Sequence, residues 1–178
     1  MNVPQMTKSE VLKRIASLRI TDAVMVIGIR GYFKDTMGVP GQNDRGIYDD
    51  AMFIVTPDSF KAYNGNTDPS KSKESIAVLQ PGIYHYKKGM HGVSGPHPYM
   101  ALRQDSNVTI KRDGSNELET DSPENRFWID IHRGGYTTTS SLGCQTIHPD
   151  QWCNFRDFVF EAMEKHDQHR VPYILIEA

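Results

Sequence analysis

Short apolar segments separated by polar turns occupy most of the chain, and two segments repeat their apolar residues with the period of a helix. Residues 7–18 carry this pattern behind a Thr or Ser cap, which predicts a short amphipathic N-terminal helix. Residues 148–168 carry the longer pattern, and Pro149 and Asp150 stand near its start, where such residues favour helix initiation. We therefore expect one helix near each end of the chain.

The other apolar segments are rich in β-branched and aromatic residues, which favours strands. In chain order, strands are predicted at 23–33, 51–57, 76–89 with an interruption at Gln80-Pro81-Gly82, 99–104, 108–114, 126–132 and 171–178. Residues 62–75 are polar and contain an Asn-Gly turn, so they are interpreted as a loop. Many short strands with accessory helices predict a mostly-β fold, an antiparallel sandwich or barrel.

Composition places the chain among globular proteins. The 178 residues are 38% hydrophobic and 24% charged, and no repeat or composition break divides them. A single domain is expected over residues 1–178, with 1–20 as an N-terminal helical extension. The net charge of −2, without a long run of one sign, argues against nucleic acid as the main partner.

The sequence also carries expectations about membranes and location. No segment reaches the roughly 18 apolar residues of a membrane-spanning helix, so no membrane insertion is expected. The first residues lack the apolar core of a secretory signal, so synthesis as a cytoplasmic chain is expected. A role outside that compartment requires release or delivery by another system.

Residues 128–152, WIDIHRGGYTTTSSLGCQTIHPDQW, concentrate the candidate chemistry. Alternation along the predicted strand 126–132 assigns Trp128, Asp130 and His132 to the face opposite the core. A loop of Gly, Thr and Ser then leads to Cys144. A cysteine nucleophile requires a base, an accessible sulfur and donors for the oxyanion. His132 is the candidate base, Asp130 a possible orienter of its ring, and Gly143 permits backbone N–H groups at 143 and 144 to share one target.

The segments IHRGG and SSLGC resemble the catalytic domain of the L,D-transpeptidase (YkuD-like) family, in which a strand ending in Ile-His-Gly precedes Ser-x-Gly-Cys. The upstream stretch LQPGIY is similar to the family's Thr-Pro-x-Gly-x-Tyr element, so the resemblance spans roughly residues 76–160. It implies a β-sandwich or barrel of the L,D-transpeptidase type, with a longer helix after the cysteine. It also implies acyl transfer on peptidoglycan stem peptides or cross-links without a cofactor or metal.

Carried over by position, the resemblance makes Cys144 the acylated nucleophile, His132 the base, and Gly143 and Cys144 the oxyanion donors. Substrate-side positions are Ser141, Arg133, Gly134, Tyr84 and His97. Two positions depart from the family pattern. Leu142 stands in place of the usual second histidine, and Thr146 in place of an arginine tied to transpeptidation. We therefore expect hydrolysis, as by a phage lysin or a delivered effector, with L,D-transpeptidation proper as an alternative.

Two further classes remain open. The chain could be a non-catalytic wall-binding or phage structural module on the same fold, in which case the thiol has no reason to be reactive. It could be an NlpC-type cysteine peptidase, although that family places its cysteine before its histidine, the opposite of the order seen for His132 and Cys144.

Other polar residues have plainer interpretations. Asp49-Asp50 follows a turn and is expected to be solvated. Cys153 lies in the helical pattern between Trp152 and Phe155 and is expected to be a buried apolar thiol. The histidines at 85, 91 and 97 lack zinc-binding spacing and are interpreted as surface-loop residues, with the lining of a substrate cleft as the alternative.

Overall fold

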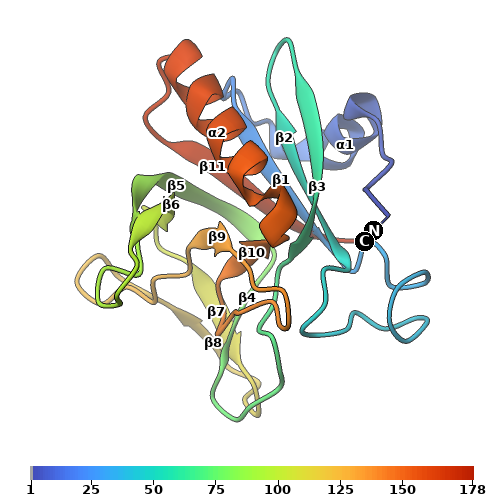
Figure 1. The fold of residues 1–178 in the computed structure, drawn as a ribbon, viewed down its shortest axis with the longest axis vertical. Coiled ribbons are helices and arrows are strands. Elements are labelled where there is room, and N and C mark those ends of the chain that lie inside the picture. Colours follow the sequence, from blue (N-terminus) through green and yellow to red (C-terminus); the bar gives the residue numbers. More distant parts are fainter. Residues whose placement is uncertain (1) are drawn as a thin grey trace.

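The computed structural model describes residues 2–178, and a closed β-barrel is its largest element (Figure 1). Around the barrel the strands follow the order β1, β11, β5, β6, β9, β10, β3 and β2. Their bounds are β1 Met25–Arg30, β2 Asp50–Val55, β3 Phe60–Asn66, β5 Gly82–His91, β6 Tyr99–Gln104, β9 Ile131–Arg133, β10 Gln145–Ile147 and β11 Val171–Glu177. A separate antiparallel sheet is formed by β4 Ala77–Leu79, β7 Thr109–Arg112 and β8 Leu118–Thr120.

The N-terminal helix α1, Lys8–Ile15, packs on the outer face of the barrel and continues as a 3₁₀ turn, η1, at Ala16–Leu18. Thr7 and Glu10 form a capping box at its start, so two of the otherwise unpaired backbone N–H groups are satisfied. Val11 and Ile15 are buried against outward-facing residues of β1, β2 and β11. The predicted helix is confirmed.

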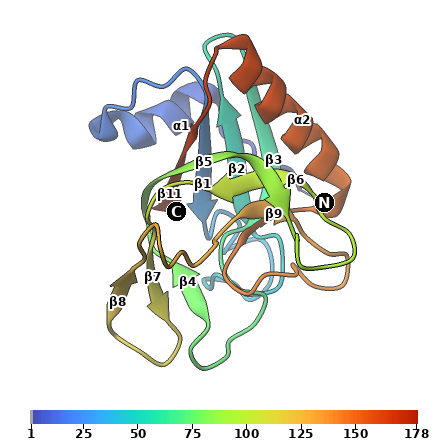
Figure 2. The same ribbon diagram turned by 90° about the vertical axis from the view of Figure 1, so that its left-hand side faces the viewer.

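The long helix α2, Pro149–Lys165, covers the opposite face of the same strands, as Figure 2 shows. His148 is its N-cap and Pro149 occupies the first turn, where a missing N–H costs nothing. Trp152 and Phe155 point into the barrel's core, and burial of each such side chain contributes about 1.5–3 kcal/mol. Cys153 is exposed, so the prediction of a buried thiol is wrong. Trp152 and Phe155 occupy the inward-facing positions of this part of α2, and Cys153 lies on the outer face.

The mostly-β composition with an N-terminal helix and a later helix is confirmed. Most strand pairs are antiparallel, as expected, but β1 pairs with β11 and β9 with β10 in parallel. The predicted loop 62–75 is also wrong in its first part, where β3 pairs with both β2 and β10. Polar side chains are tolerated in the buried part of this strand because they form hydrogen bonds with neighbouring residues. The Asn64 side chain, for example, donates to the backbone of Asn2 at 2.7 Å.

The predicted strand 126–132 is reduced to β9 at its end. Trp128 has a φ of 55°, a left-handed conformation that interrupts the strand and its alternation of faces. The Trp128 side chain is consequently exposed, whereas Asp130 and His132 are both buried. The pattern thus identified the right residues but misplaced Trp128 relative to them.

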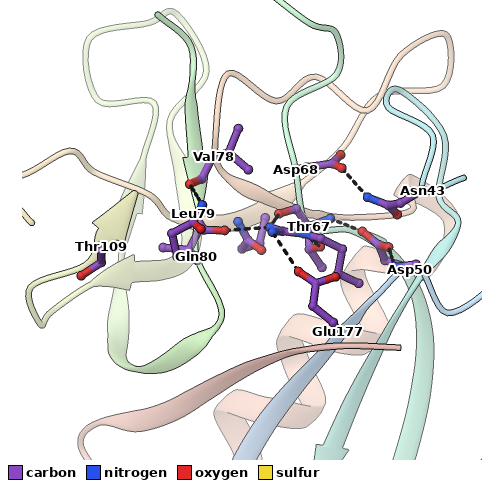
Figure 3. Close-up of polar contacts among 12 residues, drawn as sticks. Asn43, Asp50, Thr67, Asp68, Val78, Leu79, Gln80, Thr109 and Glu177 are labelled. Atoms are coloured by element: carbon purple, nitrogen blue, oxygen red, sulfur yellow. Dashed lines mark hydrogen bonds and ion pairs between the residues drawn. The ribbon is translucent and has the colours of Figure 1, made fainter. Parts of the chain in front are cut away.

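Asp49 and Asp50 are fully buried, so their predicted place in a solvated turn is wrong. Asp50 accepts hydrogen bonds from the backbone N–H groups of Gly31 and Thr67. Arg30 reaches the Thr67 hydroxyl at 3.0 Å and the Leu79 carbonyl oxygen at 2.9 Å. Figure 3 shows these contacts, beside the hydrogen bond between Asn43 and Asp68.

We call this set of buried contacts around Arg30 and Asp50 the barrel-end network. It joins β1 to β4 and fixes the segment after β3, because its donors and acceptors belong to those elements. Burial raises the pKa of Asp49 to about 7 and that of Asp68 to about 7, with Asp50 adding to both effects. The barrel-end network therefore holds these carboxyl groups in an environment that disfavours their ionised form.

Candidate active site

The parallel pair β9 and β10 places the segment that ends in His132 beside the segment that follows Cys144. His132 stands opposite Thr146 in the register, and the Gln145 N–H donates to the Asp130 carbonyl oxygen at 2.9 Å. Cys144 lies directly before β10 and two residues before Thr146, so strand alternation favours the face that carries His132. Main-chain hydrogen bonds set the register of the two strands.

A tight turn holds Cys144 at the start of β10. The Ser141 hydroxyl accepts a hydrogen bond from the Gly143 N–H at 3.0 Å and donates one to the Cys144 carbonyl oxygen at 2.6 Å. Gly143 has a φ of 135°, and a Cβ there would lie 2.8 Å from the Ala77 carbonyl oxygen, so a side chain is excluded. Ser141 thus shapes the turn, and it occupies the Gly143 N–H that the sequence assigned to an oxyanion.

The hydrogen bonds of His132 fix its tautomer. Its Nδ1 lies 2.8 Å from the Arg133 carbonyl oxygen, and a carbonyl oxygen only accepts, so Nδ1 carries the proton. The Tyr99 hydroxyl lies 3.3 Å from the same nitrogen. Nε2 is therefore the nitrogen with a free lone pair, as a general base requires.

Burial leaves the thiol and the imidazole uncharged. It raises the pKa of Cys144 to about 12, and the Asp130 carboxylate adds to that effect. It lowers the pKa of His132 to about 4, and the neighbouring His91 adds to that effect. The thiol donates to the Trp128 carbonyl oxygen at 3.5 Å, and among residues 2–178 no hydrogen bond joins it to His132. The pair at rest is neutral, not a thiolate–imidazolium pair.

Asp130 contacts His91 and Arg103 and does not contact the ring of His132. Its Oδ2 lies 2.8 Å from His91 Nδ1 and 3.1 Å from the Arg103 guanidinium. His91 in turn stacks on His132, with ring centroids 4.1 Å apart and planes 14° apart. The interpretation of His91 as a surface-loop residue is therefore wrong, and any orienting effect of Asp130 reaches His132 through His91.

An open groove of about 450 Å³ lies beside this cluster. His91, Arg103, Trp128, Asp130 and residues 92–94 line it. The Arg103 guanidinium lies 4.4 Å from the centre of the Trp128 ring, so the wall of the groove is a stacked cation and indole. Trp128 also supplies the carbonyl oxygen that binds the Cys144 thiol, so one residue contacts both the groove and the sulfur.

The remaining predicted positions divide into two groups. Arg133 and Gly134 continue from His132, and the Arg133 guanidinium lies 5.7 Å from the centre of the Tyr99 ring. Tyr84 is buried in the barrel and donates to the Gln80 carbonyl oxygen at 2.7 Å, while His97 is exposed in the 92–98 loop. Within residues 2–178, no hydrogen bond or ring stacking joins Tyr84 or His97 to the cysteine–histidine pair.

The barrel-end network supports the turn that carries Cys144. Ser70 follows the segment fixed by Asp50, and its hydroxyl accepts from the Ser141 N–H at 2.7 Å. Its own N–H donates to the Ser141 carbonyl oxygen at 2.9 Å, and its hydroxyl lies 2.7 Å from that of Thr139. Sequence reasoning missed this support because Ser70 and Ser141 lie 71 residues apart.

Residues 2–178 contain no group of three or more His, Cys, Asp or Glu side chains placed to hold a metal ion. In the same residues, neither helix has the length and apolar character needed to cross a membrane. No protein-family model, no curated protein and no solved structure matches the chain.

Proposed function

We propose that this chain is a cysteine-dependent acyl-transfer enzyme that cleaves or exchanges amide bonds in peptidoglycan stem peptides or their cross-links. The observation that carries the proposal is the register of β9 and β10, which sets His132 opposite Thr146, two residues after Cys144, with His132 Nδ1 bound to the Arg133 carbonyl oxygen and Nε2 left as a base. The resemblance of IHRGG and SSLGC to the L,D-transpeptidase motif supports peptidoglycan as the substrate class.

The proposed reaction has two halves. In the first, Sγ of Cys144 bonds to the amide carbonyl carbon, its proton moves to His132 Nε2, and a carbonyl electron pair moves to oxygen. The C–N bond then breaks, and the amine leaves with its electron pair and the proton from His132. In the second, water or another amine attacks the thioester, which releases the acyl group and returns the thiol. Water gives hydrolysis, and an amine gives transpeptidation.

The neutral resting pair supports a particular timing for the first proton transfer. Because burial raises the pKa of Cys144 and lowers that of His132, the proton leaves sulfur while the substrate is being attacked, not before. Catalytic hydrogen bonds that are long in a free enzyme commonly shorten once the substrate is bound. Substrate in the groove must therefore turn the thiol from the Trp128 carbonyl oxygen toward His132.

The test is digestion of purified peptidoglycan, with product analysis by mass spectrometry, in the presence and absence of an added D-amino acid. The comparison uses the parent protein, Cys144→Ala, His132→Ala and Cys153→Ala, the last being a matched control because Cys153 is exposed and lies on α2. New free carboxyl ends show hydrolysis, and incorporation of the D-amino acid shows exchange. Product formation that persists in Cys144→Ala would rule the proposal out.

A second candidate, a non-catalytic wall-binding module, is favoured by the exposed apolar side chains near the turn. Trp128, Tyr136 and Leu142 are 51%, 77% and 75% exposed, and the raised pKa of Cys144 suits an inert thiol. Such a module would sediment with peptidoglycan and release no product. Its binding would be unchanged in Cys144→Ala and weakened in Trp128→Ala.

A further inference from the structure

The candidate site holds two imidazoles, and each is held through its Nδ1. His132 binds the Arg133 carbonyl oxygen and His91 binds the Asp130 carboxylate, both at 2.8 Å. The rings stack with centroids 4.1 Å apart. Each ring therefore keeps Nε2 for exchange of a proton, because a carboxylate and a carbonyl oxygen both accept from Nδ1.

The two rings differ in their access to solvent. His132 is 6% exposed, whereas the side chain of His91 is 23% exposed and lines the open groove. Water or an amine that arrives through the groove therefore meets His91 before His132. The buried ring lies on β9, beside the strand that follows Cys144, whereas the more exposed ring is accessible to a nucleophile from outside.

The contacts of His91 hold its ring and leave Nε2 uncommitted. The Asp130 carboxyl group, which is 1% exposed, lies 2.8 Å from His91 Nδ1. Arg103 shares the same carboxyl group at 3.1 Å, and the Tyr99 ring lies 5.6 Å away at 62°. Because Nδ1 is held by Asp130, Nε2 is the nitrogen of His91 that can exchange a proton with a bound nucleophile.

We infer that His91, held by Asp130, is a second acid–base group of this site, which activates the water or amine that resolves the acyl-enzyme. The inference rests on the proposed function. As the nucleophile's oxygen or nitrogen bonds to the thioester carbonyl carbon, its proton moves to His91 Nε2. The C–S bond then breaks, sulfur leaves with the electron pair, and the proton returns to sulfur. Both imidazoles and the thiol end the cycle neutral.

The test separates formation of the acyl-enzyme from its breakdown, with p-nitrophenyl acetate as the acyl donor. All proteins carry Cys153→Ala, because that exposed thiol would also react. The burst of p-nitrophenolate reports acylation of Cys144, the steady state reports deacylation, and intact mass reports the acetyl-enzyme. Two variants remove the base in different ways: His91→Phe keeps an aromatic ring on His132, and His91→Asn keeps an N–H for Asp130.

We expect both variants to retain the burst and to lose about 10²-fold or more of the steady-state rate, with the acetyl-enzyme accumulating. A role in packing alone would instead spare the variant that keeps the relevant contact, so an unimpaired steady state in either variant overturns the inference. Loss of the burst together with the steady state also overturns it, because His91 would then act in thiol activation. Absence of a burst in the parent protein is the separate failure of the proposed function.

Discussion

Two buried polar clusters lie in this small barrel, and they differ in which groups their hydrogen bonds join. In the barrel-end network, both carboxylate oxygens of Asp50 accept backbone N–H groups, and Arg30 spreads its donors over Thr67 and Leu79. In the site cluster, His91 and His132 each commit one nitrogen and keep the other. Hydrogen bonds to backbone groups fix the backbone, whereas a cluster with uncommitted ring nitrogens beside a groove can move protons.

The largest expected effect lies in the barrel-end network. Replacement of Arg30 by Met leaves the buried Thr67 and Leu79 carbonyl oxygens without the guanidinium that donates to them. We expect the free energy of unfolding to fall by about 3–5 kcal/mol, because each buried acceptor left without a partner costs about 1–3 kcal/mol. Urea denaturation measures it. Cys144→Ala is the control from the other cluster, and an equal loss in both variants would remove the distinction between them.

A smaller effect is expected at the turn that links the clusters. Gly143→Ala forces a side chain into a φ of 135° and against the Ala77 carbonyl oxygen, which costs about 1–3 kcal/mol. The shift displaces Cys144, so product formation from peptidoglycan should fall further than stability does. Gly41→Ala is a matched control, since Gly41 also has a positive φ but nothing lies within 4 Å of its Cβ position. Equal loss of activity in both variants would contradict this account.

The pH dependence of stability should have opposite signs in the two clusters. The pKa of Asp68 is raised to about 7 in the fold, so the native state holds a proton that the unfolded chain has lost. Stability from this group is present below the unfolded pKa near 4 and is lost as pH rises toward 7. Unfolding of Asp68→Asn, measured from pH 4 to 8, should lack that decline. A wild-type-minus-variant difference that is flat with pH would refute the assignment.

His132 should contribute the reverse slope. Its pKa is lowered to about 4 in the native state, whereas in the unfolded chain the imidazole takes up a proton near pH 6.5. Stability from this group is complete above pH 6.5 and is lost as pH falls toward 4. In His132→Gln this acid-side loss should shrink. A decline on the acid side as steep as that of the wild type would show that another group causes it.

The smallest expected effect is a difference in labelling rate that leaves stability unchanged. Because the pKa of Cys144 is raised to about 12, little thiolate forms at neutral pH, whereas Cys153 is exposed on α2. Iodoacetamide at pH 7 should therefore modify Cys153 first, as peptide mapping would show. The rate at Cys144 should climb as pH rises above neutrality. Preferential labelling of Cys144 at pH 7 would instead indicate a preformed thiolate.

Local patterns were sufficient for the parts of the fold that rest on neighbouring residues. The Thr7 cap, the period of α2 and the strand at 99–104 follow from such patterns and are confirmed. The segment 60–66 was missed because its polar residues are stabilised by pairing with two distant strands. The burial of Asp50 could not be foreseen either, because its donors belong to Gly31 and Thr67.

The candidate site, too, could be predicted only where its residues are close in the sequence. Its nucleophile and base could be proposed from one continuous stretch, residues 128–152. His91 could not, since its partner Asp130 lies 39 residues away and meets it only through the pairing of β5, β6 and β9. The alternation of faces predicted along 126–132 also fails at Trp128, which has a left-handed backbone conformation. No pattern in the neighbouring residues predicts that conformation.

The parallel pairing of β9 with β10 has a consequence for protein engineering. Eleven residues, 134–144, connect the two strands, but the strand pairing and the turn at Ser141–Gly143 hold the two ends of this connection. The middle of that connection is therefore a position for loop grafting. A library of insertions at 136–138, which leaves Ser141 and Gly143 untouched, would vary the surface beside the start of α2 while β9 and β10 keep their register.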